Sequence, residues 1–209
     1  MLARSRLILC TWRARSSQAL AEALKRYAVL SHPLVQISSL AINQLGIPTA
    51  NLPVDESLTP WIADVKSGVY FGYASLALPA IHPDAGALST DAATATPNTS
   101  SLSKFQIFPM VMSIGYNPFY GNTVRSAEVH VLHGFTADFY DAHMRLLILG
   151  FIREEQNYDS LEALVKDINT DCDVAKSSLK RETWAPAKGL VVGSDVDGKL
   201  NAKWLLESL

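Results

Sequence analysis

The chain has 209 residues, 48% of them hydrophobic and 18% charged, a composition typical of globular proteins with one packed core. Its 18 basic and 20 acidic residues give a net charge of −2, which argues against a protein built around a basic surface for nucleic acid. No apolar run approaches the roughly 20 residues of a membrane-spanning helix, so no membrane span is expected. The two cysteines, Cys10 and Cys172, indicate neither a disulfide framework nor a thiolate metal cluster and fit a reducing compartment.

The first 21 residues contain four arginines and no acidic residue, which resembles a mitochondrial transit peptide. The alternative is a short basic helix packed on the domain, because Leu20, Leu24 and Tyr27 recur at helical spacing. Both interpretations stay open. We therefore treat residues 1–30 as a basic N-terminal extension and expect the protein in the cytoplasm or the mitochondrion.

Strand-like segments dominate the middle of the chain. Residues 33–53 combine β-branched and apolar residues with Gly46 and prolines, a mixture typical of strand and loop. Four further segments have the apolar or alternating character of strands: residues 68–78, 109–116, 127–135 and 144–152. The middle of the protein is therefore predicted to be all β.

Residues 79–103 break this pattern, since 17 of these 25 residues are Ala, Ser, Thr or Pro and none is Lys or Arg. Such a segment buries too little apolar surface to order itself. We interpret it as a flexible surface insertion between two strands, without an assigned function.

One amphipathic helix follows the strands. Asp159 and Glu162 have the spacing of a capping box, and a set of mostly apolar residues falls on one helical face: Leu161, Leu164, Val165, Ile168, Cys172, Ala175 and Leu179. Residues 180–209 then form a C-terminal extension with a proline and three glycines. This extension is expected either to wrap the core or to fold back as a short element.

Thr49 and Asn51 are candidate ligands for a hard cation. They follow Gly46 and Pro48 on a stiffened turn, and their spacing of two residues puts their oxygens on one face of an extended segment. Hydroxyl and amide oxygens suit magnesium. The competing interpretation is an ordinary turn in which both side chains cap backbone groups.

Glu128 is a carboxylate within an apolar strand. Alternation places Glu128 and His130 on one face, and Val129, Val131 and His133 on the other. A carboxylate in such a position needs a partner or a role, and beside a triphosphate it could accept the proton of an attacking alcohol. The alternative is an ion pair on a solvent-facing strand, with Arg125 as partner.

Other familiar sites are not indicated. His130 and His133 are three apart on a strand, so a zinc site built from both is not expected. The chain contains neither Gly-x-Gly-x-x-Gly nor Gly-x-x-x-x-Gly-Lys-Ser/Thr, so both common nucleotide-binding loops are missing from the sequence.

Five sequence blocks, in this order, resemble the riboflavin kinase family: LGIPTANLP (45–53), GVYFGYASL (68–76), SIGYNPFYGNT (113–123), EVHVLHGFTADFY (128–140) and LGFIREEQNYDSLEALVKDI (149–168). The resemblance extends over residues 45–179, within an expected kinase domain of residues 31–179. It implies a small closed Greek-key β-barrel with a C-terminal helix, which transfers the γ-phosphate of ATP to the 5′-hydroxyl of riboflavin to form FMN.

The resemblance also implies the site. Thr49 and Asn51 match the family's metal and ATP ligands, with Mg²⁺ expected and Zn²⁺ as the alternative, and Glu128 matches the catalytic acid or base. The remaining matches are Val131, His133 and Tyr140 for ATP, and Arg153, Gln156 and Tyr158 for riboflavin or FMN. Partners are expected to be these small molecules and ADP, with no nucleic acid, and the protein is expected to be a monomer.

The sequence departs from the family just before Leu45. The family usually has a glycine-rich basic loop over the phosphates there, whereas residues 37–44 contain no Gly, Lys or Arg. An impaired flavin-binding protein on the same barrel is therefore one alternative. A small-barrel module for oligonucleotides is another, which the near-neutral charge disfavours. The N-terminal segment is too short for an adenylyltransferase domain, so FAD synthesis is not expected.

Overall fold

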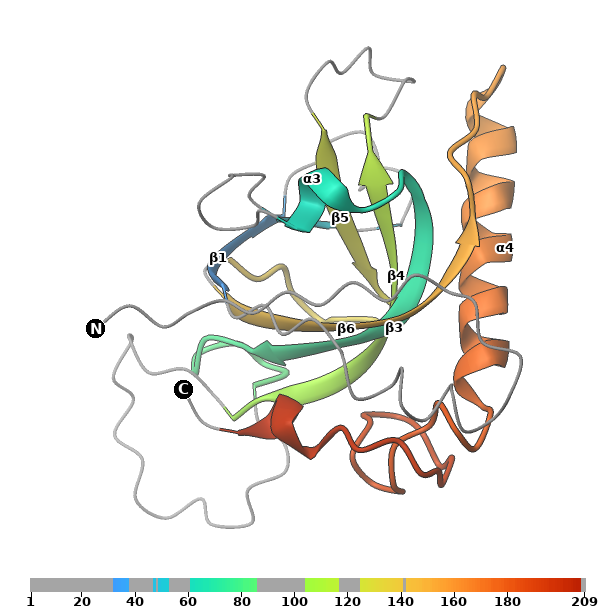
Figure 1. The fold of residues 1–209 in the computed structure, drawn as a ribbon. Coiled ribbons are helices and arrows are strands. Elements are labelled where there is room, and N and C mark those ends of the chain that lie inside the picture. The colour runs from blue at the N-terminus through green and yellow to red at the C-terminus, as the bar shows by residue number, and fades with distance from the viewer. Residues whose placement is uncertain are drawn as a thin grey trace, which may run out of the picture.

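The computed structural model describes residues 32–37, 47, 49–52, 61–85, 104–116, 125–140 and 142–207. In this part of the chain, six strands form a closed barrel in the order β1-β2-β5-β4-β3-β6, and every neighbouring pair is antiparallel (Figure 1). The strands are β1 (His32–Ile37), β2 (Ala50–Asn51), β3 (Gly68–Ala77), β4 (Gln106–Gly115), β5 (Ser126–Val131) and β6 (Ala142–Arg153). The helices are α3 (Trp61–Asp64), α4 (Leu161–Leu179) and the 3₁₀ helix η2 (Lys203–Leu206).

The topology is a Greek key. Strands β3, β4 and β5 pair consecutively, and β6 returns to the free edge of β3. The predicted Greek-key barrel with a C-terminal helix is thus confirmed. The strand expected at residues 127–135 ends earlier, because the chain bends after Val131 and the Leu132 N–H donates to the Pro109 carbonyl at 2.8 Å.

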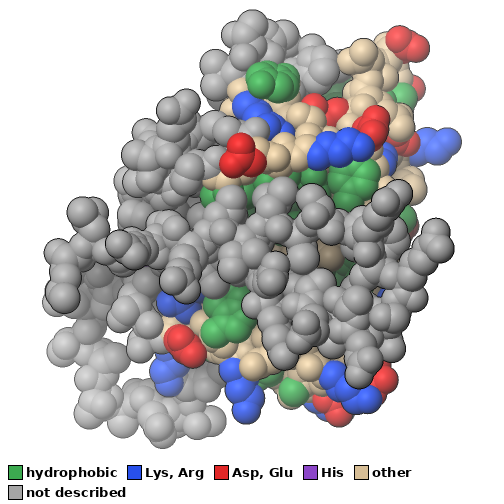
Figure 2. All heavy atoms as spheres, in the orientation of Figure 1, with side chains coloured by type: hydrophobic (Ala, Val, Ile, Leu, Met, Phe, Trp, Pro, Cys, Tyr) green, Lys and Arg blue, Asp and Glu red, His purple; other side chains and the backbone are tan. Residues whose placement is uncertain are grey.

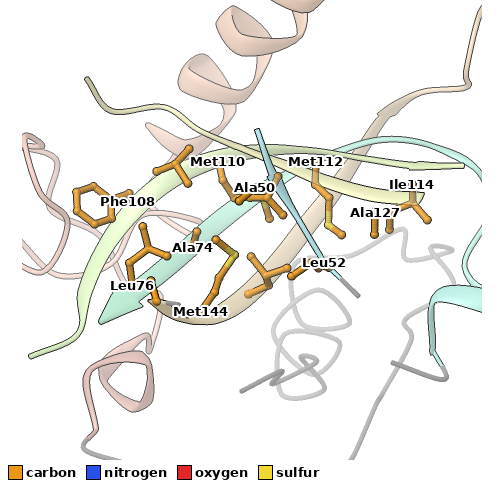
Figure 3. Close-up of a cluster of buried hydrophobic side chains, with 14 of the residues drawn as sticks. Ala50, Leu52, Ala74, Leu76, Phe108, Met110, Met112, Ile114, Ala127 and Met144 are labelled. Carbon is orange, nitrogen blue, oxygen red and sulfur yellow. The ribbon is translucent and has the colours of Figure 1, made fainter. Parts of the chain in front are cut away.

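Apolar side chains of the inner strand faces fill the barrel. Figure 3 shows this cluster, in which residues from β2, β3, β4, β5 and β6 point toward one another. Its labelled members are Ala50, Leu52, Ala74, Leu76, Phe108, Met110, Met112, Ile114, Ala127 and Met144. Burial of such side chains at about 1.5–3 kcal/mol each is the main force that closes the barrel.

A second cluster lies on the outside of the barrel, where β3 and β4 are covered. The outward residues Phe71, Tyr73 and Val111 pack with the buried residues of α4 and with the C-terminal segment. Both strands are therefore buried on two faces, which explains why they read as nearly continuous apolar runs. Figure 1 shows α4 standing along this side of the barrel.

The predicted apolar face of α4 is buried in the C-terminal half of the helix but not at its start. Cys172, Ala175 and Leu179 are buried as expected, whereas Leu161 is 42% exposed. The N-cap is Ser160, whose hydroxyl accepts from the Ala163 N–H at 3.2 Å, so the expected capping box from Asp159 is wrong by one residue. No helix in the described part of the chain is long and apolar enough to cross a membrane.

The C-terminal extension wraps the barrel. Arg145 of β6 donates to the carbonyls of Trp204 and Leu205, each at 3.2 Å, and of Glu207 at 2.6 Å. The Ser75 hydroxyl of β3 donates to the same Leu205 carbonyl at 2.7 Å. The described residues of this segment, up to 207, thus wrap the barrel and also include a short element, the 3₁₀ helix η2.

Acidic and basic side chains are intermixed on the surface. Figure 2 shows blue and red side chains of the described residues close together on the visible face. Two exposed ion pairs, Lys66–Glu154 at 2.5 Å and Lys199–Glu182 at 2.8 Å, illustrate this mixing. It agrees with the small net charge of the chain.

Candidate active site

The short strand β2 orients Thr49 and Asn51. Ala50 and Leu52 belong to the barrel core, so alternation turns the side chains of Thr49 and Asn51 to the outer face. Thr49 is 7% exposed and Asn51 is half-buried. The two oxygen-bearing side chains therefore share one face, as the sequence predicts, and both lie at the edge where β2 pairs with β5.

Glu128 is the cross-strand partner of Asn51. Strand β5 alternates as expected, with Ala127, Val129 and Val131 in the core and Glu128 half-buried on the outer face. Glu128 lies opposite Asn51 on one side and opposite Ser113 of β4 on the other. The Ser126 hydroxyl donates to Glu128 Oε1 at 3.4 Å.

Arg125 is not the ion-pair partner of Glu128 within the described residues. Its guanidinium donates to the Val65 carbonyl and, at 3.4 Å, to the Ser67 hydroxyl. The ion pairs between described residues do not include one that joins Arg125 to Glu128. The ion pair of Glu128 with Arg125 is therefore not formed among the described residues, and the alternative of a structural carboxylate stays open.

The strand registers extend this arrangement into a row on the outer face. The pairs run from Asn51 to Glu128, Ser113, Val69 and Arg153, across β2, β5, β4, β3 and β6. Adjacent strands are about 4.8 Å apart, so Arg153 is about 14 Å from Glu128 along the row. Glu128 lies between the candidate metal ligands at one end and the candidate flavin segment at the other.

A pocket of about 540 Å³ opens beside Thr49. Its walls are the start of β2, the end of β5, the loop of residues 132–138 that follows β5, and α4. It brings together three residues that the sequence predicts for ATP: Thr49, Val131 and His133. The helix contributes Asn169, Cys172 and Lys176.

Aromatic rings form one wall of this pocket. The His133 ring lies 4.8 Å from Phe108 and 4.8 Å from Phe135, and Phe135 lies 4.9 Å from Phe139. Tyr140 follows the buried Phe139, is 52% exposed and is not among the lining residues. The structure thus groups Val131 and His133 with Thr49, and leaves Tyr140 at the surface.

The beginning of the expected insertion packs against this aromatic wall. His82 is 8% exposed, and its Nε2 bonds to the Ala137 carbonyl at 2.9 Å. The Asp84 carboxylate accepts from the N–H and the hydroxyl of Thr136, at 2.8 and 2.9 Å. Hydrogen bonding from the Thr136 N–H lowers the pKa of Asp84. Residues 79–85 are therefore not a free loop, and residues 86–103 lie outside the described residues.

The candidate flavin segment is tied to α4. Arg153 forms a bidentate pair with the buried Asp171, at 3.0 and 2.8 Å, and the Tyr158 hydroxyl donates to Asp167 at 3.0 Å. Burial raises the pKa of Tyr158. Gln156, between them, is exposed. The three candidate residues are neighbours on one segment, and the pocket lining does not include them.

Gly115 brings this segment close to the strand of Glu128. A Cβ on Gly115 would collide with the Glu155 carboxylate, so the chain after β6 lies directly against the end of β4. Gly115 is in turn the cross-strand partner of Ser126, whose hydroxyl contacts Glu128. The end of β4 therefore links the flavin segment to Glu128.

Several residues that line the pocket or pack behind its wall have no clear signal in the sequence. His82 and Asp84 lie in a stretch rich in alanine, serine and threonine, which predicts only a loop. Lys176 adjoins the apolar face of α4, yet only the packing direction of the helix turns it to the pocket. Phe135 and Phe139 were within reach of sequence reasoning, because they are aromatic residues in a matched block.

The oxygen donors at β2 can be compared with the needs of a metal ion. No group of three or more His, Cys, Asp or Glu side chains that could hold a metal occurs among the described residues. A hydroxyl and an amide oxygen on one face fit a hard cation that takes its other ligands from phosphates and water. The donor set of Thr49 and Asn51 is of this kind.

Comparisons with known proteins agree with this geometry. A family model described as Flavokinase: Riboflavin kinase matches residues 24–179. The riboflavin kinase of Pyricularia oryzae is 61% identical over 167 residues, covering 78% of both chains, and that of Chaetomium globosum is 59% identical over 172 residues, covering 75% of this chain and 73% of the relative. The crystal structure of riboflavin kinase from Trypanosoma brucei superposes with a TM-score of 0.50 and 25% identity, over 73% of this chain and 80% of that one. The chain belongs to the riboflavin kinase family.

Proposed function

We propose that this riboflavin kinase carries out phosphoryl transfer at Glu128, between ATP held at Thr49 and riboflavin held near Arg153. Its reaction moves the γ-phosphate of ATP onto the 5′-hydroxyl of riboflavin and yields FMN and ADP. The supporting observation is the row on the outer barrel face, in which Glu128 separates Asn51 from Ser113, Val69 and Arg153. A phosphate that approaches from one end and a ribityl chain that approaches from the other meet at this carboxylate.

Glu128 acts as the general base in this proposal. Its carboxylate orients the 5′-hydroxyl and accepts the proton as the oxygen attacks phosphorus. The half-buried position and the Ser126 hydroxyl fix the carboxylate, and no ion pair between described residues involves it. Phosphoryl transfer relies mainly on positioning and charge stabilisation, so holding the hydroxyl in line is the larger part of this role.

Thr49 and Asn51 bind the metal and the phosphates of ATP. When bound, Mg²⁺ supplies charge neutralisation on the phosphate oxygens. A buried hydroxyl and an amide oxygen favour Mg²⁺ over Zn²⁺, which prefers nitrogen and sulfur ligands. Because Asn51 faces Glu128 directly, the phosphate held there is adjacent to the base.

The nucleoside of ATP occupies the pocket beside Thr49. Val131 and the His133 ring give it an apolar and aromatic wall. Tyr140, which is exposed and outside the lining, is assigned to ATP by the family resemblance alone. Residues 37–44 lack the family's glycines and basic residues, and residues 38–46 lie outside the described part of the chain. Lys176 of α4 supplies positive charge at the pocket wall in their place.

Riboflavin binds along the segment after β6. Gln156 and Tyr158 contact the flavin. Arg153, which donates to Asp171 and, through Nη1, to the Glu154 carbonyl at 3.1 Å, joins them through its remaining N–H groups. The ion pair with Asp171 also anchors the segment to α4. A monomer is the proposed active unit.

A turnover assay tests the proposal. The protein is incubated with riboflavin and ATP in the presence of Mg²⁺ or Zn²⁺, and flavins are separated by chromatography. FMN and ADP should form in equal amounts, faster with Mg²⁺. Tight riboflavin binding without FMN formation would instead favour a flavin-binding protein that has lost catalysis.

A further inference from the structure

The loop of residues 132–138 forms much of the pocket wall. Its start is anchored by the Leu132 N–H bond to the Pro109 carbonyl and by packing of His133 and Phe135 on Phe108, whereas its backbone from residue 136 to 138 lacks such support. It contains no helix or strand, and Gly134, Thr136, Ala137 and Asp138 are exposed. A loop with few buried contacts samples several conformations unless other groups hold its backbone.

The turn of residues 79–85 supplies the missing support. Asp84 accepts two hydrogen bonds from Thr136, at 2.8 Å from its N–H and 2.9 Å from its hydroxyl. One residue further along the loop, the Ala137 carbonyl bonds to His82 Nε2 at 2.9 Å. Two successive residues of this loop, of which Ala137 lines the pocket, are thus held by residues 50 or more positions earlier in the chain.

His82 is fixed in the orientation that this contact needs. Its Nδ1 accepts from the Asp84 N–H at 3.1 Å, so Nε2 carries the proton and donates to the Ala137 carbonyl. Its ring meets Phe135 at 6.3 Å and Phe139 at 6.0 Å, both edge to face. The turn therefore holds the backbone of the wall and the two aromatic rings that line it.

We propose that His82 and Asp84 are positioning residues for the nucleotide: they hold the loop of residues 132–138 in the shape that binds ATP. This inference rests on the proposed assignment of the pocket beside Thr49 to ATP. Neither side chain lines the pocket, so both act through Thr136, Ala137 and the aromatic wall. The beginning of the segment that the sequence predicts to be a flexible insertion thus has a function.

The physical consequence is a specific kinetic change. If the loop is correctly shaped only part of the time, the apparent affinity for ATP falls by that fraction, while the chemistry of the bound complex is unaltered. Loss of the two bonds to Asp84 should reduce the competent fraction to about one tenth. KM for ATP should then rise about tenfold in Asp84→Ala, with kcat at saturating ATP and KM for riboflavin within twofold of wild type.

The test compares variants in steady-state FMN formation and in melting temperature. Thr136→Val removes the hydroxyl bond and keeps the N–H bond to Asp84, so it should raise KM for ATP by less than Asp84→Ala does. Thr136→Ser should keep wild-type values, and the double variant Asp84→Ala/Thr136→Val should be no worse than Asp84→Ala. Asp195→Ala, which removes an exposed carboxylate on the C-terminal segment, is the matched control and should change nothing. Should Asp84→Ala fail to fold, Asp84→Asn and Thr136→Val carry the test.

A pair of segment replacements separates the turn from the rest of the insertion. Exchange of residues 86–103 for a short glycine-containing link should leave KM for ATP unchanged, because loop-closure entropy depends weakly on length. Exchange of residues 79–103 also removes His82 and Asp84, so it should raise KM for ATP as Asp84→Ala does. Equal changes from both replacements would overturn the role of the turn.

The outcomes also separate this inference from the proposed function. Unchanged KM for ATP in folded Asp84→Ala and Thr136→Val would overturn the role of the turn and leave the ATP assignment intact. A rise in KM for riboflavin alone would overturn the ATP assignment and, with it, this proposal. A lower kcat, a higher KM for both substrates and a lower melting temperature together would overturn it as well, because they would indicate a general loss of structure.

Discussion

Asn51 on β2 and Glu128 on β5 are direct cross-strand partners, and both side chains lie on the outer face of the barrel. Opposed residues in an antiparallel pair have Cβ atoms about 4.5–5.5 Å apart. The candidate metal ligand and the candidate base are therefore adjacent by virtue of strand register alone. The contact requires β2, although this strand has only two residues.

Thr49→Val tests the metal site. Valine keeps the shape of threonine and removes the oxygen, so kcat/KM should fall by at least about 10²-fold, the usual effect of losing one stabilising group at a phosphoryl-transfer site. Steady-state assays over a range of Mg²⁺ concentrations measure the effect. Thr49→Ser keeps the hydroxyl and should retain most activity. Normal turnover by a folded Thr49→Val protein would remove this residue from the site.

Arg145→Met tests whether the C-terminal extension is part of the stable domain. Arg145 is 7% exposed, donates to three carbonyls of the extension and stacks 3.9 Å from the Phe105 ring centroid. Methionine keeps the apolar stem and removes every donor, so unfolding free energy should fall by about 2–4 kcal/mol while KM values stay constant. Urea denaturation measures the loss. Lys203→Met, at an exposed position nearby, is the control, and an equally small effect of both changes would contradict the prediction.

Asp84 predicts a pH dependence of stability. Hydrogen bonds from the N–H and the hydroxyl of Thr136 lower its pKa in the folded state. A group with a depressed folded pKa stabilises the protein above its unfolded pKa, and this contribution is lost as pH falls through the folded value. The difference in melting temperature between wild type and Asp84→Ala should therefore be constant from pH 7 to about pH 5 and shrink below about pH 4. A difference that grows on acidification would contradict this sign.

Sequence reasoning reached the barrel and its strands because their signals are local. Alternation along β5 is enough to predict that the side chain of Glu128 points to the face opposite that of Val129 and Val131. The neighbours across the strands could not be derived, since the pairing of Glu128 with Asn51 and Ser113 depends on register between distant segments. The same holds for Arg153, whose partner Asp171 is fixed only when α4 packs against the barrel.

The misjudged segment is residues 79–85. Its small residues and prolines indicate a loop, and composition contains no information on what a loop touches. His82 and Asp84 gain their roles from contacts with Thr136 and Ala137, more than 50 residues later. Such contacts appear only in the folded chain.

The composition of the N-terminal extension predicts where the protein is located in the cell. Residues 1–31 lie outside the described residues, and their arginine-rich, acid-free composition suggests import into mitochondria. A fluorescent reporter fused to residues 1–27 should then leave the cytosol. Replacement of the four arginines by glutamine should return it there. A cytosolic signal from the unaltered fusion would favour the alternative of a basic helix packed on the domain.

Glu128→Gln and Glu128→Ala divide the catalytic role of the carboxylate. Glutamine can hold the 5′-hydroxyl but cannot accept its proton, whereas alanine can do neither. General-base catalysis contributes about 10²–10⁴-fold, so kcat of Glu128→Gln should fall within this range while substrate affinities change little. The low end is expected, because in a loose, metaphosphate-like transition state the attacking hydroxyl loses its proton late.

The comparison of the two variants decides between positioning and basicity. A Gln variant close to wild type beside an inactive Ala variant would mean that orientation of the hydroxyl dominates, and equal losses would mean that proton transfer does. Ser126→Ala is the matched control, since it removes the hydroxyl that contacts Glu128 Oε1 and should cost less than either. Near-normal kcat in both Glu128 variants, with melting temperature preserved, would make Glu128 a structural residue and the catalytic assignment wrong.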